Sequence, residues 1–319
     1  MKVIRDLKNF TSTKKTVLTI GTFDGVHIGH QKIIQQLVAV AKAQNLESVV
    51  LTFFPHPRMV LQNENAVQMI DSMEEKIHGL EQLGVDILVI HPFSLSFSRT
   101  TAVSFARDTI ATQLNCQHVI IGYDHRFGQN REATIKDLEQ FGEVYDFQVT
   151  VIPVQDIESI AVSSTKIRKA IVSGDLPSAQ RYLNRPFRLA GTVVQGERVG
   201  KTIGFPTANL KIEEIYKLQP PKGVYLVNST IDKHLYWGMM NIGNRPTFEG
   251  KKITVEVHFF DLNQDLYQRK ISLNLFEKIR EEKKFDSQES LQEQLKKDKL
   301  HCVRIIGEIP NRTTTFAKN

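Results

Sequence analysis

The chain has 319 residues, enough for about two domains, and its 41% hydrophobic and 24% charged residues exclude a wholly disordered protein. Cys116 and Cys302 lie far apart, which excludes a disulfide framework and a cysteine-rich zinc site, and no apolar run approaches the roughly 20 residues that span a bilayer. The polar, charged N-terminus is unlike a signal peptide, so we expect a cytoplasmic protein, and its net charge of +6 suits phosphate-bearing small molecules at least as well as nucleic acid.

The first half of the chain alternates apolar runs with segments of helical periodicity. Strands are predicted at 17–20, 48–53, 87–90, 118–121 and 148–152. Helices are predicted at 33–41, 74–83, 102–114 and 135–141. Alternation of this kind is typical of crossover units, so we expect a doubly wound α/β domain with a parallel sheet covered on both faces.

After Pro186 the pattern changes to short, often alternating runs separated by Gly, Pro or Asn. Strands are predicted at 187–194, 224–231, 235–242, 253–259 and 271–275. This spacing indicates an antiparallel barrel or sandwich. An amphipathic helix is predicted at 287–297, with Ser287 as N-cap and Leu291 and Leu295 on one face. We place the domains at 1–184 and 185–306, followed by a polar tail at 307–319.

The strongest local signal is the segment 21–30, GTFDGVHIGH, which follows the first strand and opens a helix. In open α/β sheets ligands bind at the carboxyl ends of strands, where helix N-termini present free amides to anions. Side chains of His27 and His30 can then donate hydrogen bonds to an α-phosphate in the transition state. The other candidate binding residues of this segment are Gly21, Thr22, Phe23, Asp24 and Gly29.

Two alternatives apply to this histidine pair. Such pairs are more often structural or exposed than catalytic. Asp24, His27 and His30 are also evenly spaced enough to suggest a metal site, but zinc takes three or four ligands and no further His or Cys stands nearby. The strand–turn–helix context favours phosphate chemistry.

Three further segments follow or accompany predicted strands. His56 lies in FPHPR, where the prolines alone would stop the strand. Ser163–Arg168 (SSTKIR) is a second anion-binding candidate, although an N-cap before a solvated basic face has the same pattern. Gly122–Gly128 (GYDHRFG) is either a turn or a nucleotide-binding loop. The candidate residues in the last two segments are Ser164, Thr165, Lys166, Arg168, Asp124 and Arg126.

Together these segments resemble the adenylyltransferase module of the bacterial bifunctional riboflavin kinase/FMN adenylyltransferase family, the FAD synthetases. The resemblance rests on the HxGH-type motif, TFFPHP at 52–57, the GxDxRFG-like stretch and 163–168. Thr22 stands where members usually have Asn, and His125 where they often have an aromatic residue. Threonine there is typical of related nucleotidyltransferases, so this half alone does not name the acceptor substrate.

The second half carries an independent set of motifs. The segment around Gly196 and Gly200 at first suggests a Walker A loop, but its glycines enclose three residues instead of four. The helix that must follow a Walker A loop would also be interrupted by Pro206, so we reject a P-loop. The run 203–210, IGFPTANL, is similar to the riboflavin kinase signature. The other matches are GVY at 223–225, NIGNRPTF at 241–248, VEVHFFD at 255–261, DLY at 265–267 and REEKKFDS at 280–287. Gln268 stands where the family usually has Gly.

The resemblance implies an antiparallel β-barrel kinase domain with a C-terminal helix. Glu256 shares the polar face of its strand with Thr254 and His258; it would be an ordinary solvated carboxylate but for the resemblance, which makes it the catalytic base. Thr207 and Asn209 match residues that coordinate Mg²⁺ with ATP phosphates. Gly196–Gly204 would cover the nucleotide, although a glycine-rich hairpin has the same pattern. The implied kinase binding residues are Gly196, Gly200, Lys201, Gly204, Pro206, Thr207, Asn209 and Arg280.

The resemblance therefore implies a two-module enzyme that converts riboflavin to FMN and FMN to FAD. Its expected ligands are riboflavin, FMN, FAD, ATP, ADP and pyrophosphate, with Mg²⁺ and no redox cofactor, nucleic acid or membrane. One rival is an adenylyltransferase for another phosphate acceptor with a regulatory barrel. Another is a basic nucleic-acid-binding barrel fused to a degenerate nucleotide domain. The absence from the barrel of a clustered stripe of basic and aromatic residues, which single-strand binders use, argues against this rival.

Overall fold

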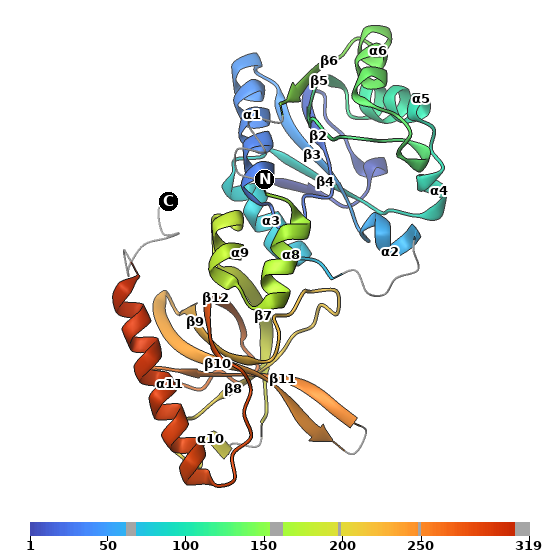
Figure 1. The fold of residues 1–319 in the computed structure, drawn as a ribbon. Helices are drawn as coiled ribbons and strands as arrows, with labels where there is room; N and C mark the ends of the chain where they lie inside the picture. The colour runs from blue at the N-terminus through green and yellow to red at the C-terminus, as the bar shows by residue number, and fades with distance from the viewer. Residues whose placement is uncertain (62–67, 154–161, 197–198, 248–249, 310–319) are drawn as a thin grey trace. The chain divides into compact units, whose positions relative to one another are not determined.

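A computed structural model describes residues 1–61, 68–153, 162–196, 199–247 and 250–309 (Figure 1). The chain divides into two compact units. The first comprises Met1–Lys166 with Tyr216–Leu218, and the second Ile167–Ile215 with Gln219–Asn319. This division falls earlier in the chain than the domain boundary expected at residue 184.

The first unit is built on a six-stranded parallel sheet. Its strands are β1 (Lys2–Ile4), β2 (Thr16–Ile20), β3 (Glu47–Phe53), β4 (Ile87–His91), β5 (Cys116–Gly122) and β6 (Gln148–Ile152). Their order in the sheet is β1-β4-β3-β2-β5-β6, so the direction of winding reverses between β2 and β5. Ligand crevices of open α/β sheets form at such a reversal, at the carboxyl ends of the strands. The edge strand β1 was not predicted, because three residues are too few to show a period.

Helices cover both faces of this sheet, as the doubly wound prediction requires. They are α1 (Ile28–Gln44), α2 (Pro57–Leu61), α3 (Met73–Gln82), α4 (Leu95–Ser98), α5 (Ala102–Ser104) and α6 (Ile135–Tyr145), with short helical segments η1 (Leu7–Asn9), η2 (Phe105–Gln113) and η3 (Gln129–Arg131). Figure 1 shows α1 on one side of the sheet and α5 and α6 on the other. The helix predicted at 102–114 is one α-turn that continues as a π-helix through η2.

Successive side chains of each central strand enter two different cores. Leu18 belongs to the core that also holds Phe105 and Leu138, whereas its neighbour Val17 packs with Ile34 and Leu37 of α1. Every residue of β2 is buried. Burial on both faces explains why these strands are continuous apolar runs rather than alternating ones.

The second unit contains a closed antiparallel barrel, which decides between the barrel and the sandwich. Its elements are the part of α8 (Ser164–Ser173) that follows Lys166, α9 (Leu176–Leu183), β7 (Phe187–Val194), α10 (Val199–Thr202), β8 (Ala208–Lys211), β9 (Gly223–Ile231), β10 (His234–Thr247), β11 (Gly250–Phe259), β12 (Lys270–Arg280) and α11 (Gln288–Glu308). The strands close in the order β10-β11-β8-β7-β12-β9, with β9 paired to β10. The short strand β8 was not predicted, and α10 is the one turn of helix that forms before Pro206.

The C-terminal helix α11 packs along the barrel (Figure 1) and is longer than the predicted 287–297. Ser287 caps it as expected, accepting a hydrogen bond from the Ser290 amide. Leu291 and Leu295 pack against a core that includes Val224 and Met239. The helix ends at Glu308, so it includes the first two residues of the expected tail, and 310–319 lie outside the described residues.

A buried ion pair joins α11 to β12. Asp298, whose side chain is only 3% exposed, binds the Arg280 guanidinium at 2.8–3.0 Å. We expect Asp298→Ala to lower the free energy of unfolding of the second unit by about 3 kcal/mol, because it leaves a largely buried cation unpaired. Trp237 is the chain's one tryptophan and packs on Phe276 in this unit, so its fluorescence during urea denaturation measures the change.

The control for this variant is Glu293→Ala, which removes the exposed pair with Lys297 and should cost less than about 0.5 kcal/mol. Equal denaturation midpoints for the Asp298 and Glu293 variants would show that the buried pair contributes no more than an exposed one.

Candidate active sites

The HxGH segment lies where the sheet order reverses. β2 ends at Ile20, and α1 begins at Ile28 with His27 as its N-cap. The His27 ring accepts a hydrogen bond at Nδ1 from the backbone N–H of His30, at 3.4 Å. A neutral imidazole that accepts at Nδ1 carries its proton on Nε2. The capping contact therefore leaves His27 with one N–H donor on the opposite side of the ring.

The two histidine rings are stacked on each other. Their centroids lie 3.6 Å apart with 19° between the planes, and the Phe23 ring meets His30 edge-on at 5.2 Å. The Nδ1 atom of His30 is buried and has no hydrogen-bond partner among the described residues. The sequence-predicted pair is thus held as one rigid unit by local contacts from its own motif.

Both imidazoles are kept neutral by burial. Desolvation lowers the pKa of His27 to about 4, an effect that the Asp71 carboxylate partly opposes. Desolvation, and then the charges of His27 and Lys76, lowers the pKa of His30 well below its ordinary value. Two neutral rings can stack without repulsion and can act as hydrogen-bond donors near neutral pH.

The lowered pKa of His27 predicts that acid destabilises the first unit. Between the folded pKa of about 4 and the unfolded 6.5, the unfolded chain binds more protons, so stability falls as pH falls. Between pH 7 and pH 5, His27 alone should cost about 2 kcal/mol in the free energy of unfolding. Urea denaturation followed by circular dichroism measures this change in the free energy of unfolding. The transition of the first unit is the one that Trp237 fluorescence, which follows the second unit, does not report. His27→Gln should reduce the dependence, and an equal dependence in that variant would refute the assignment.

Asp24 serves the fold of its own unit. It is 1% exposed, and its Oδ1 accepts hydrogen bonds from the amides of Ile70 at 2.9 Å and Asp71 at 3.4 Å. The carbonyl of Thr22 accepts from Lys76 Nζ at 2.7 Å and from Thr52 Oγ1 at 3.3 Å. Nothing in the sequence singles out Lys76 or Asp71. Lys76 is an ordinary charged residue of a predicted helix, and Asp71 lies in the segment before that helix.

The second anion-binding candidate, the segment 163–168, contacts the HxGH loop. Ser164 Oγ donates to the carbonyl of Asp24 at 3.0 Å, so the start of α8 and the HxGH loop are in contact. Thr165 and Lys166 are exposed and Arg168 is half-buried. Thr165 and Lys166 therefore face solvent at the start of α8.

The remaining N-terminal candidates are placed as follows. His56 is buried, and its Nδ1 accepts from the Arg58 amide at the start of α2. Asp124 and Arg126 are exposed just beyond the carboxyl end of β5. The intervening His125 stacks on Phe127, and burial lowers its pKa to about 4. Gly21 directly follows β2, and Gly29 is buried in the first turn of α1.

In the second unit, β8 and β11 bring the expected kinase residues together. Asn209 pairs directly with Glu256 across the two strands, so their side chains share one face. Thr207 Oγ1 lies 3.4 Å from the Glu256 carboxylate. A Cβ atom at Gly196 would collide with the Asn209 amide, so a larger residue there would displace the Asn209 side chain. Burial of Val255 and Val257 confirms that Glu256 lies opposite them, but His258, expected on the polar face with Glu256, is buried.

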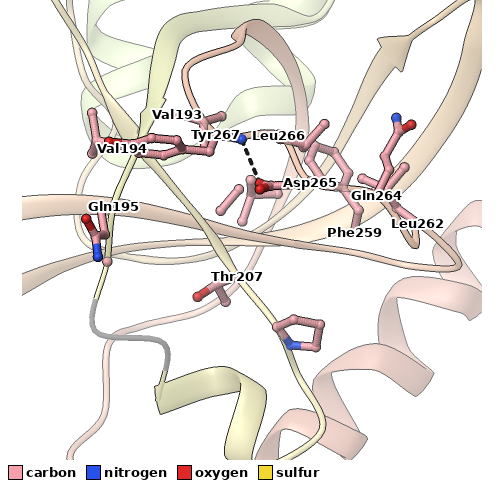
Figure 2. A pocket seen from close by; sticks show the side chains of 14 residues that line it. Val193, Val194, Gln195, Thr207, Phe259, Leu262, Gln264, Asp265, Leu266 and Tyr267 are labelled. Carbon is pink, nitrogen blue, oxygen red and sulfur yellow. Dashed lines mark hydrogen bonds between the residues drawn. The ribbon is translucent and has the colours of Figure 1, made fainter.

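Two residues of this group, Gly196 and Thr207, also line a cavity of about 490 Å³ (Figure 2), whereas Asn209 and Glu256 are not among its lining residues. Gly196, Pro206 and Thr207 line it together with apolar side chains and a loop after β11. The other lining residues are Val193, Val194, Gln195, Ala208, Val257, Phe259, Leu262, Gln264, Asp265, Leu266 and Tyr267. The wall thus combines apolar surface, which can pack against a ring-containing ligand, with polar groups that can orient it.

Two contacts hold parts of this cavity wall. His258 Nδ1 lies 2.8 Å from the Pro206 carbonyl, and this contact joins the IGFPTANL run to β11. The Asp265 carboxylate accepts from the Tyr267 amide at 2.9 Å and turns the loop (Figure 2). Gln195, Leu262 and Gln264 were not anticipated, because nothing in their sequence context distinguishes them from ordinary loop residues.

The other kinase candidates lie outside the cavity wall. Arg280 is bound to Asp298 of α11. A Cβ at Gly200 would collide with the Phe205 carbonyl, and Gly204 has a φ of +78°. Lys201 lies in α10, but its side chain is outside the described part, as are residues 197–198 of the expected covering loop.

No cluster of three or more His, Cys, Asp and Glu side chains with metal-binding geometry occurs among the described residues, Asp24 and the two histidines included. Thr207 and Asn209 offer hydroxyl and amide oxygens instead, next to the Glu256 carboxylate. Such hard oxygen donors fit Mg²⁺, which keeps several waters and shares phosphate oxygens of its substrate.

Comparison with known proteins matches each unit to a different enzyme. The family model described as FAD synthetase matches residues 9–166, and the one described as riboflavin kinase matches residues 183–306. A bifunctional riboflavin kinase/FMN adenylyltransferase of Listeria monocytogenes is 37% identical over 88% of this chain and 90% of its own. Its counterpart in Escherichia coli K12 is 35% identical over 96% of this chain and 98% of its own. The chain belongs to the bifunctional riboflavin kinase/FMN adenylyltransferase family.

The fold is also that of a solved structure, a Streptococcus pneumoniae protein described as a macrolide-efflux protein. It is 33% identical to this chain and superposes with a TM-score of 0.86. The match covers 94% of this chain and 98% of that protein. In this member of the riboflavin kinase/FMN adenylyltransferase family, no helix in the described ranges has the length and hydrophobicity to cross a membrane. The FAD synthetase match contains His27 and His30, and the riboflavin kinase match contains Thr207, Asn209 and Glu256.

Proposed function

We propose that the two units carry out successive steps of flavin cofactor synthesis. The second unit phosphorylates riboflavin with ATP to give FMN and ADP, and the first transfers AMP from ATP to FMN to give FAD and pyrophosphate. The observation that carries this proposal is the order of the two family matches, each of which contains one of the two side-chain clusters. The functional domains would be 1–184 and 185–306, with 307–319 as a tail.

In adenylyl transfer an oxygen of the FMN phosphate attacks the α-phosphorus of ATP, and the bond to the β-phosphate oxygen breaks. This nucleophile is already an anion, so no protein base is required. Nε2–H of His27 and the neighbouring His30 would donate to the α-phosphate oxygens, whose charge rises in the transition state. The leaving pyrophosphate would be held by Ser164, Thr165, Lys166 and Arg168. Nucleotide and FMN would contact Gly21, Thr22, Phe23, Asp24, Gly29, His56, Asp124 and Arg126.

In the kinase step the 5′-hydroxyl of riboflavin attacks the γ-phosphorus, and the bond to the β-phosphate oxygen breaks to release ADP. Glu256 would accept the hydroxyl proton as the oxygen bonds to phosphorus. Thr207 and Asn209 would hold Mg²⁺, which neutralises phosphate charge when it is bound. The remaining binding residues would be Gly196, Gly200, Lys201, Gly204 and Pro206, with Arg280 acting from its ion pair with Asp298.

Incubation of the full-length chain with riboflavin, ATP and Mg²⁺, with FMN and FAD resolved by chromatography, tests the proposal. FMN should appear first and FAD after it. When FMN replaces riboflavin in the same mixture, the products should be FAD and pyrophosphate. An adenylyltransferase for another acceptor would leave riboflavin unphosphorylated. We propose a cytoplasmic enzyme that needs neither nucleic acid nor membrane; salt-dependent retention of RNA on filters would contradict this.

A further inference from the structure

A lysine is buried beneath the HxGH loop. Lys76 of α3 is 1% exposed, which is unusual because lysine is seldom buried unless its charge is paired. Its ammonium donates to the Thr22 carbonyl at 2.7 Å. Burial lowers the pKa of Lys76, and the carboxylates of Asp24 and Asp71 oppose this effect and favour its charged form. The lysine therefore brings a positive charge and a hydrogen-bond donor to the loop between β2 and α1.

This loop has a conformation that must be held from outside. Phe23 and Val26 have φ angles of 44° and 38°, in the left-handed region that non-glycine residues seldom adopt. Such residues persist only where surrounding contacts determine them. Two charged groups supply those contacts on either side of Phe23. Lys76 binds the carbonyl of Thr22, and the Asp24 carboxylate binds the amides of Ile70 and Asp71.

The same lysine acts on the charge of the histidine pair. Its ammonium and the ring of His27 oppose protonation of His30, whereas Asp71 favours protonation of His27. With Asp24, these are the ionisable groups that face the pair and the lysine. The positive charge near the pair is therefore supplied by Lys76, and the imidazoles can stay neutral and stacked.

We infer that Lys76 is a positioning residue for adenylyl transfer, which holds the strained loop through the Thr22 carbonyl and thereby fixes His27 and His30 as a stacked donor pair. This inference rests on the proposed adenylyltransferase function of the first unit. Lys76 itself contacts the loop rather than the substrate. Its effect on the reaction is to set where the two imidazole donors lie.

The first test compares Lys76→Met and Lys217→Met in the full-length chain. Lys217 is matched to Lys76, because it is also buried in the first unit and also donates to a backbone carbonyl, that of Ile70. We expect Lys76→Met to lower kcat for FMN adenylylation about 100-fold, since small displacements of catalytic groups have effects of that size. KM for ATP should change less than about threefold, and Lys217→Met should keep kcat within about threefold.

The second test follows the histidine Cε1–H signals by NMR from pH 4 to pH 8. In the unaltered chain His27 and His30 should remain neutral down to about pH 5. In Lys76→Met the titration midpoint of His30 should rise by about one pH unit or more, because the cation that opposes its protonation is gone. Loosened packing would admit water and raise the midpoints of both histidines, so a rise confined to His30 identifies the charge effect, and an unchanged His30 midpoint would overturn it.

A charge-balanced double variant, Lys76→Met with Asp71→Asn, answers the concern that the single variant does not fold. It removes one charge of each sign and still removes the donor to Thr22. FMN adenylylation should stay at least about 10-fold below the unaltered level, and full recovery would overturn the positioning role. If the unaltered chain makes no FAD from FMN, the proposed function fails, while the NMR titration still tests Lys76 independently.

Discussion

His30→Ala is expected to lower the rate of FMN adenylylation about 1,000-fold while leaving riboflavin phosphorylation within about twofold. Removal of one preorganised donor to a developing oxyanion costs about 100- to 1,000-fold, and this change also removes the ring on which His27 stacks. The kinase residues lie in the other compact unit, so the phosphorylation rate should be unaffected. Initial rates of FAD formation from FMN and of FMN formation from riboflavin, measured on one preparation, check both parts.

His78→Ala is the matched control, because His78 is an exposed histidine of the same unit. It should keep both activities. Loss of riboflavin phosphorylation together with adenylylation in His30→Ala, with circular dichroism unchanged, would argue against two independent sites. An adenylylation rate within about tenfold of the original would mean that the histidine pair serves the fold rather than the reaction.

Glu256→Gln should produce the converse result. The amide keeps the size of the side chain and can still contact Thr207, but it cannot accept the proton of the riboflavin 5′-hydroxyl. General-base removal typically costs about 100- to 10,000-fold, so FMN formation should become barely measurable. FAD formation from supplied FMN should be unchanged. The pair of variants thus separates the two reactions on one polypeptide.

Glu293→Gln controls for the loss of a carboxylate from the same unit, since Glu293 is exposed on α11. It should leave both rates unchanged. An adenylyltransferase with a regulatory barrel would instead show no riboflavin phosphorylation in any variant. A Glu256→Gln chain that phosphorylates riboflavin at the original rate would remove this carboxylate from the mechanism.

Several features of the fold were predictable because they are local in the sequence. Apolar runs such as that of β2 are continuous because both of their faces are buried, and this alone predicts a covered parallel sheet. The alternation of buried Val255 and Val257 with Glu256 predicts which face of β11 is polar. The HxGH segment has its strand, turn and helix within one short stretch, so its placement at a helix N-terminus followed from pattern alone.

Other features depend on contacts between residues distant in the chain. Lys76 meets the Thr22 carbonyl across 54 positions, and in sequence it is an ordinary charged residue of an amphipathic helix. Arg280 lies in a recognisable motif, yet its ion pair with Asp298 follows only from the packing of α11 on β12. Gln195 and Gln264 line the cavity because the barrel closes around them.

Periodicity thus determined a covered parallel α/β domain followed by an antiparallel β domain, because each pattern is encoded within single elements, whereas the chemistry of both side-chain clusters stays a prediction. Tertiary structure alone decided which charges are buried, which cations are held by carboxylates and where the barrel leaves a cavity. The physical reason is that desolvation and charge pairing depend on neighbours brought together by folding, and no local pattern records those neighbours.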